Sequence, residues 1–214
     1  MRVSKRMRKA IRAIPVLIGV FLALLFTGCE QLFTSSLFSS FQRNPSELSY
    51  EQQVTYGEEA LASGDQETMK DAYEALAESI ENTSEPDPDV LELAGDLAVG
   101  ASGLNDVLPK LVGAVETDSF SSTEDLESIF EDSLDDVDYQ YIDEAEDQLT
   151  AATKAGADIS EEQYLTVAAG LAMKAEDDGT GMENSTELED FVDTAVSAMG
   201  PDYDGPLKDL QGAL

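Results

Sequence analysis

The sequence predicts an all-α protein in which about four αα-hairpins follow one another along the chain. Three observations lead to this fold class. Apolar residues recur three or four positions apart through most of residues 49–200, which is the period of an amphipathic helix. Helix start and stop signals separate these stretches. No stretch shows the two-residue alternation of a half-buried strand.

The first predicted hairpin begins at Ser49, which forms a capping box with Gln52. Gly64 ends the first helix, and Asp65 caps the second. The apolar stripe of the first helix is expected to contain Tyr50, Val54, Gly57 and Leu61. The second helix is expected to bury Met69, Tyr73, Leu76 and Ile80.

The second hairpin is predicted to begin at Asp87 as N-cap, with Pro88 at the first helical position. Its first helix is expected to bury Val90, Leu93, Ala94, Leu97 and Ala101. Ser102 and Gly103 then turn the chain into a second helix. The apolar positions of that helix are Val107, Leu108, Leu111, Val112 and Val115.

The third hairpin is predicted to begin at Ser122, and its second helix is a long acidic one from about Val137 to Gly156. The inward positions of these two helices are Leu126, Ile129, Phe130 and Leu134, then Ile142, Ala145, Leu149 and Ala152. A capping box of Ser160 with Gln163 opens the fourth hairpin. Its first helix is expected to bury Tyr164, Val167, Ala168, Leu171 and Ala175.

A third capping box, Thr186 with Glu189, is predicted to open the last long helix, which Gly200 ends. The apolar positions of this helix are Leu188, Phe191, Val192, Ala195 and Met199. Residues 201–214 are expected to form a C-terminal capping segment with one short helix from about Pro206.

The predicted hairpins begin at spacings of 38, 35 and 38 residues, a period typical of helical-repeat arrays. One hairpin leaves an apolar face open, and its neighbours in such an array cover it. Gly57, Gly95 and Gly170 lie in the first helix of three hairpins, where we expect them to let the second helix approach closely. The alternative is an irregular helical bundle without a repeat.

The first hairpin resembles a tetratricopeptide repeat. Gly57, Gly64, Asp65 and Tyr73 fall where that family places its glycine, its turn and its aromatic residue, whereas Met69 stands where the family usually has alanine. The resemblance covers residues 49–116, and periodicity alone extends it over 117–200. It implies a right-handed α-solenoid at residues 49–200 that binds other proteins and has no catalytic role.

The N-terminal segment predicts export. Residues 1–28 carry six basic residues and no acid, followed by an apolar stretch from Ile14, as in a secretory signal peptide. The sequence Phe26-Thr27-Gly28-Cys29 resembles the lipobox of bacterial lipoproteins. The resemblance implies cleavage before Cys29 and lipidation of that cysteine, with residues 29–48 as a lipidated tether.

The alternative for this segment is an uncleaved membrane anchor, but the apolar stretch is shorter than the roughly 20 residues that span a bilayer. In lipoprotein sorting, aspartate after the cysteine holds the protein at the inner membrane. Glu30 stands at that position here. The resemblance therefore favours the periplasmic face of the outer membrane over the inner membrane.

Charge and composition exclude several classes of function. From Cys29 onward, 45 acidic and six basic residues give a formal net charge of −39, which disfavours nucleic acid as a partner. The acidity fits a saline environment or, as the second interpretation, a basic partner. Histidine is absent, which excludes histidine-based catalytic triads and histidine-ligated zinc. Cys29 is the single cysteine, so no intramolecular disulfide forms.

The loop from Glu176 to Glu187 has the length of a calcium-binding EF-hand loop, with Asp178 at its third position. Its first position holds glutamate where that family requires aspartate, so we interpret the loop as a solvated acidic connection. We expect no metal, no cofactor and no catalytic residue. Tyr50, Tyr56, Tyr73 and Tyr164 are expected in the core, and Tyr139, Tyr141 and Tyr203 nearer to solvent.

These observations predict a membrane-anchored lipoprotein of the bacterial envelope that acts as a non-enzymatic binding or assembly scaffold. Its partners are the membrane, through the lipid on Cys29, and another envelope protein such as a transporter or an assembly component. The alternative function is an accessory solute-binding subunit of a periplasmic transporter, with a small ligand held inside the helical array.

Overall fold

A computed structural model describes residues 44–109, 134 and 136–214 of the chain. The chain divides into two compact units, Met1–Glu47 and Leu48–Leu214. In the first unit only residues 44–47 are described, and they contain the short 3-10 helix η1 (Pro45–Glu47). The predicted signal peptide, Cys29, nearly all of the tether and the helices predicted between 110 and 133 lie outside the described residues.

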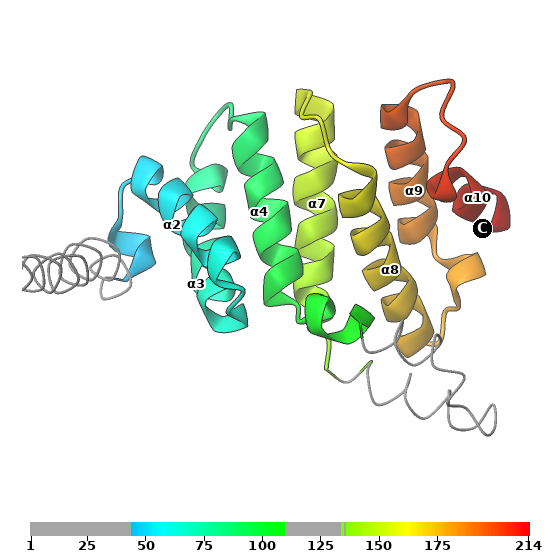
Figure 1. The fold of residues 1–214 in the computed structure, drawn as a ribbon, viewed down its shortest axis with the longest axis horizontal. Helices are drawn as coiled ribbons and strands as arrows, with labels where there is room; N and C mark the ends of the chain where they lie inside the picture. Colours follow the sequence, from blue (N-terminus) through cyan, green and yellow to red (C-terminus); the bar gives the residue numbers. More distant parts are fainter. Residues whose placement is uncertain (1–43, 110–133, 135) are drawn as a thin grey trace, which may run out of the picture. The chain divides into compact units, whose positions relative to one another are not determined.

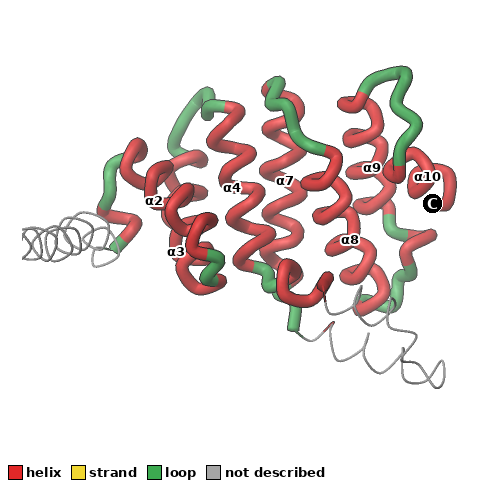
Figure 2. The backbone as a smooth tube through the Cα atoms, viewed as in Figure 1, coloured by secondary structure: helices red, strands yellow, loops and turns green. Residues whose placement is uncertain are grey.

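The described part of the second unit is helical and contains no strand, which confirms the all-α class (Figures 1 and 2). A further helix begins at Leu104. The helices with bounds on both sides are α2 (Tyr50–Ser63), α3 (Gln66–Glu81), α4 (Pro88–Ala101), α7 (Tyr139–Ala155), α8 (Glu161–Asp177), η2 (Met182–Asn184), α9 (Thr186–Met199) and α10 (Pro206–Ala213). Within the described ranges, no helix is long and apolar enough to cross a membrane.

Local signals in the sequence fix most helix ends. Capping boxes at Ser49 and Ser160 open α2 and α8 as predicted. Gly64 and Gly156 end α2 and α7 in the left-handed conformation, with φ of 67° and 97°, which glycine adopts without a steric penalty. The predicted box at Thr186 is wrong, because Ser185 is the N-cap of α9 and its hydroxyl accepts a hydrogen bond from the backbone of Leu188.

Successive helices pack against one another, and the most extensive contact joins α4 to α7, which lie side by side (Figure 1). The backbone N–H of Asp138 donates to the carbonyl of Ser102 at 2.9 Å. This bond places the start of α7 at the end of α4, so the two helices run antiparallel. The helix predicted to pair with α4 is described only as far as residue 109, and there Leu104 and Val107 are buried.

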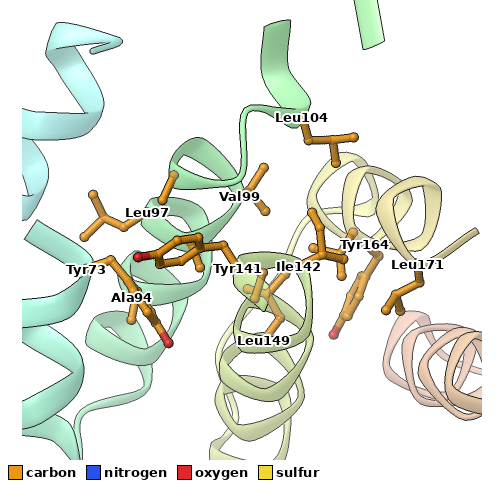
Figure 3. Close-up of a cluster of buried hydrophobic side chains, with 14 of the residues drawn as sticks. Tyr73, Ala94, Leu97, Val99, Leu104, Tyr141, Ile142, Leu149, Tyr164 and Leu171 are labelled. Atoms are coloured by element: carbon orange, nitrogen blue, oxygen red, sulfur yellow. The ribbon is translucent and has the colours of Figure 1, made fainter. Parts of the chain in front are cut away.

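The core contains almost every position predicted from periodicity in α3, α4, α7, α8 and α9 (Figure 3). Its largest fully buried side chains are Leu76, Leu97, Leu104, Ile142, Leu149, Tyr164, Leu171, Leu188, Phe191 and Leu207. The stripe predicted for α2 is partly wrong. The buried residues of that helix are Gln53, Tyr56, Gly57 and Ala60, whereas Tyr50, Val54 and Leu61 are only half-buried. Helix α2 packs against both α3 and α4. The side of α2 that faces these two helices is therefore the buried one, and it differs from the predicted stripe.

The three glycines predicted at close helix contacts do lie there, but against other helices than expected. A Cβ built on Gly57 would lie 3.0 Å from a methyl carbon of Leu97 on α4. The same construction on Gly170 of α8 meets Ile142 of α7 at 2.8 Å. Gly95 faces α7 rather than the helix that follows Gly103. Each glycine therefore allows close contact with a helix outside its own predicted hairpin. We had expected the close contact to be with the second helix of the same hairpin.

Candidate functional site

A small acidic cleft lies where the first turn of α8 passes beside α4. Its volume is about 270 Å³. Two aliphatic side chains, Leu61 of α2 and Val99 of α4, form part of its wall. Its polar lining comprises Asp96, Asn105, Ser160, Glu162, Gln163 and Thr166.

Gln163 is held at both ends of its amide group. Its side-chain oxygen accepts hydrogen bonds from the backbone N–H of Ser160 at 2.9 Å and from the Ser160 hydroxyl at 2.7 Å. Its side-chain nitrogen donates to Glu92 Oε1 at 3.0 Å and to Asp96 Oδ1 at 3.0 Å. The capping box that opens α8 therefore also positions an amide donor between two carboxylates of α4.

Asp96 lies in the middle of α4 and is half-buried. Burial raises the pKa of its carboxyl group above the ordinary value, the hydrogen bond from Gln163 lowers it, and the nearby charge of Glu92 raises it. Within the part of the chain that the structure describes, neither Asp96 nor Glu92 takes part in an ion pair. Among the described residues, the two acids therefore share one neutral amide donor, the side-chain nitrogen of Gln163.

A second group of charges joins α7, α8 and α9. The ammonium of Lys174 on α8 is bonded to Asp143 of α7 and lies 2.9 Å from Glu187 Oε2 of α9. Glu146 lies in the same acidic surroundings. Burial raises the pKa of its carboxyl group, and the charges of Asp147, Glu187 and Asp143 raise it as well. In contrast to the cleft, this cluster contains its own cation.

The EF-hand-like loop uses its end residues for other contacts. Glu187, at the twelfth position, is bonded to Lys174, and Glu176, at the first, accepts a hydrogen bond from the backbone N–H of Met182 at 3.1 Å. Asn184 donates to the carbonyl of Thr180 within the loop. No set of three or more acidic residues in the described ranges is arranged around one point as metal ligands. Both ends of the loop are therefore engaged in contacts within the protein.

Tyr141 was expected near solvent, and this prediction is wrong, because its side chain is only 6% exposed. Its ring packs edge-on against Tyr73 of α3, with the ring centroids 5.7 Å apart (Figure 3). The Tyr141 hydroxyl donates to Glu74 at 2.8 Å, and the Tyr73 hydroxyl donates to Glu144 at 2.6 Å. Burial raises the pKa of both phenols. The pair therefore links α3 to α7 by two reciprocal bonds.

The residues of the cleft were not predicted as a site. Among its polar residues, Ser160 and Gln163 alone had a local signal, their shared capping box, and that signal concerns only the side-chain oxygen of Gln163. Asp96 and Glu92 belong to a chain with 45 acidic residues, in which the spacing of any two carries no information. Comparisons of the chain with protein-family models, with curated proteins and with solved structures find no match.

Proposed function

We propose that the chain is a lipid-anchored, non-catalytic helical-repeat scaffold of the bacterial cell envelope, and that it binds or assembles another envelope protein. The observation that carries this proposal is Cys29, which follows a basic segment and a short apolar stretch in a lipobox-like sequence. Lipidation there would attach the helical unit of residues 48–214 to the membrane.

The proposed architecture is a right-handed, tetratricopeptide-like array of αα-hairpins. Its support is the contact of each helix with its neighbours in the chain and the glycines at which helices approach closely. The last helix, α10, packs on α9, and its Leu207 is fully buried, as expected of an element that caps an array. Arrays of this kind offer extended surfaces to partner proteins.

The charge of the chain makes the lipid necessary for attachment. A formal charge of −39 from Cys29 onward repels anionic headgroups, so the protein itself offers the membrane no electrostatic attraction. Each buried methylene of an acyl chain contributes about 0.8 kcal/mol, and two or three acyl chains make release effectively irreversible. Glu30 in place of aspartate favours the periplasmic face of the outer membrane.

The test has two parts. Cys29→Ser should abolish labelling by a fatty-acid analogue and leave the protein uncleaved or released from the membrane. Continued labelling of this variant would overturn the lipoprotein assignment. Crosslinking in intact envelopes, followed by mass spectrometry, should then recover a recurrent envelope protein with the wild type. If membrane anchoring brings this protein and its partner together, Cys29→Ser should lose that crosslink. Absence of any recurrent crosslink in the wild type would count against a scaffold function.

A further inference from the structure

We infer that the cleft beside Asp96 binds a primary ammonium group carried on a short alkyl chain. Two sources share this chemistry, namely a free alkylamine and the side chain of a lysine on a partner protein. Binding of either needs no lipid on Cys29, so the inference goes beyond the proposed scaffold function and can fail or succeed separately from it.

Within the described residues, the two acids on α4 have no cation as a partner. Glu92 and Asp96 lie one turn apart on α4. The side-chain nitrogen of Gln163 donates to Oε1 of Glu92 and to both carboxylate oxygens of Asp96. Each carboxylate has about four acceptor positions, so within the described part of the chain most of them accept no hydrogen bond from the protein. A half-buried carboxylate beside a like charge is costly without a cation. An ammonium group, which has three N–H donors and a positive charge, meets both demands.

The cavity has both an apolar and an acidic lining. Leu61 and Val99 give it an aliphatic wall next to the carboxylate of Asp96. Pockets that hold drug-sized ligands have volumes of about 300–1,000 Å³, whereas this cleft holds about 270 Å³. It therefore suits a small molecule or the end of one side chain. A charged head on a short alkyl stem matches the combination of carboxylate and aliphatic wall.

The polar groups of the cleft are already fixed before a ligand arrives. Asp96 is carried by the middle of a helix, and Gln163 is held by Ser160 through two hydrogen bonds. Sites built on helices and supported by neighbouring hydrogen bonds hold their geometry better than loop sites. The contrast with Glu187 is clear, because that carboxylate already has Lys174 as its cation.

An anion and a metal ion fit the cleft less well. The carboxylates of Asp96 and Glu162, which line the cleft, repel an anion. A divalent cation needs several oxygen ligands that converge on one point, and within the described residues no such convergence of acids is found. The side-chain nitrogen of Gln163 instead donates to both Glu92 and Asp96.

The test is a titration of the full-length protein in neutral detergent at low ionic strength, followed by NMR or calorimetry. The probes are butylammonium and Nα-acetyl-lysine methylamide, with 1-butanol as the uncharged control. Saturable binding of an ammonium probe and none of butanol is expected. Asp96→Asn, which keeps the shape of the side chain, should weaken binding at least tenfold. Tighter binding of the lysine derivative would assign the site to a partner's lysine, and tighter binding of butylammonium would assign it to a free amine.

The matched control is Asp190→Asn, which removes the same charge from an exposed position of α9. This variant should bind both probes as the wild type does. Equal weakening by Asp96→Asn and Asp190→Asn would mean that the negative surface attracts cations without a site, and would overturn the inference. Absence of saturable binding by either ammonium probe would overturn it too. Glu162→Gln, an exposed change at the rim, should reduce affinity two- to threefold and guards against a folding defect in Asp96→Asn.

Discussion

Gly95 of α4 packs directly against the side chain of Leu149 of α7. A Cβ built on Gly95 would stand 2.6 Å from Cδ2 and 2.8 Å from Cγ of Leu149. Leu149 is fully buried, so its branch atoms have close-packed neighbours and little room to move. Together with the hydrogen bond from Asp138 to Ser102, this contact makes α4 and α7 direct neighbours.

Gly95→Ala should therefore destabilise the helical unit. The added methyl group overpacks the contact with Leu149, and overpacking in a core costs about 1–3 kcal/mol. Urea unfolding followed by circular dichroism measures the loss. Gly212→Ala is the matched control, because a Cβ at Gly212 meets nothing within 4 Å. In that helical position alanine should be neutral or stabilising by up to about 1 kcal/mol. Similar losses in both variants would contradict the assigned contact.

For this contact, the inward-facing positions could be predicted from the sequence, but the pairing of the two helices could not. The helical period identified Leu149 as inward-facing, because that property depends on residues three and four positions apart. The recurrence of glycine in the first helices of the predicted hairpins identified Gly95 as a position of close helix contact. Which helices face each other depends on contacts between residues far apart in the chain. The four-hairpin register therefore placed Gly95 against the helix after Gly103, whereas the structure places it against α7.

In the candidate site, too, the local contact could be predicted and the long-range contacts could not. The local pattern predicted the capping box of Ser160 with Gln163, and the structure confirms it. The partners of the Gln163 nitrogen lie on α4, 67 and 71 residues away in the chain, so no local pattern could indicate them. Tyr141 was misplaced for a related reason. Its burial comes from Tyr73 on α3, a contact that requires α7 to lie beside α4 and close to α3.

Asp96 should make stability depend on pH. Its pKa is raised by burial, so the folded protein keeps this proton at pH values where the unfolded chain, with an ordinary aspartate pKa of about 3.9, has lost it. The free energy of unfolding then falls as the pH rises from that ordinary value through the raised one. Asp96→Asn removes this ionisation. Relative to the wild type, the variant should become more stable across this pH interval and keep the advantage above it.

Chemical denaturation at a series of pH values from 3 to 8 measures this difference. Asp190→Asn, which alters an exposed carboxylate, serves as the control and should run parallel to the wild type. Glu146, whose pKa is also raised by burial, contributes in the same direction in every variant and cancels from the comparison. A constant difference between Asp96→Asn and the wild type over the whole range would show that the Asp96 proton does not contribute.

Tyr73→Phe should destabilise the protein by about 1 kcal/mol. The change removes the hydroxyl that donates to Glu144 at 2.6 Å and keeps the ring contact with Tyr141. Hydrogen bonds to charged groups contribute about 1.5–3 kcal/mol, and we take a lower value because Glu144 is half-exposed to water. A double-mutant cycle with Glu144→Gln tests the assignment. If the two losses add without coupling, the bond between these side chains does not stabilise the fold.

Lys174→Gln should destabilise the protein by about 1 kcal/mol at low ionic strength and less in 1 M salt. The side chain of Lys174 is only 20% exposed and lies between Asp143 and Glu187, so its loss leaves two acids and Glu146 together without a cation. Exposed ion pairs usually contribute less than 1 kcal/mol, and salt screens what remains. Lys154→Gln, at an exposed position near the end of α7, is the control and should change stability by less than about 0.5 kcal/mol.

The pairing of Lys174 with Glu187 also predicts how the loop responds to calcium. Glu187 is the residue that would bind calcium with both oxygens in an EF-hand, and here its carboxylate already holds an ammonium group. Glu176 at the other end of the loop accepts a hydrogen bond from Met182. Millimolar calcium and magnesium should therefore raise the melting temperature equally at matched ionic strength, through screening alone. A larger shift with calcium that disappears in Glu187→Gln would instead establish a calcium site, and Lys174→Gln should then strengthen it because the competing cation is gone.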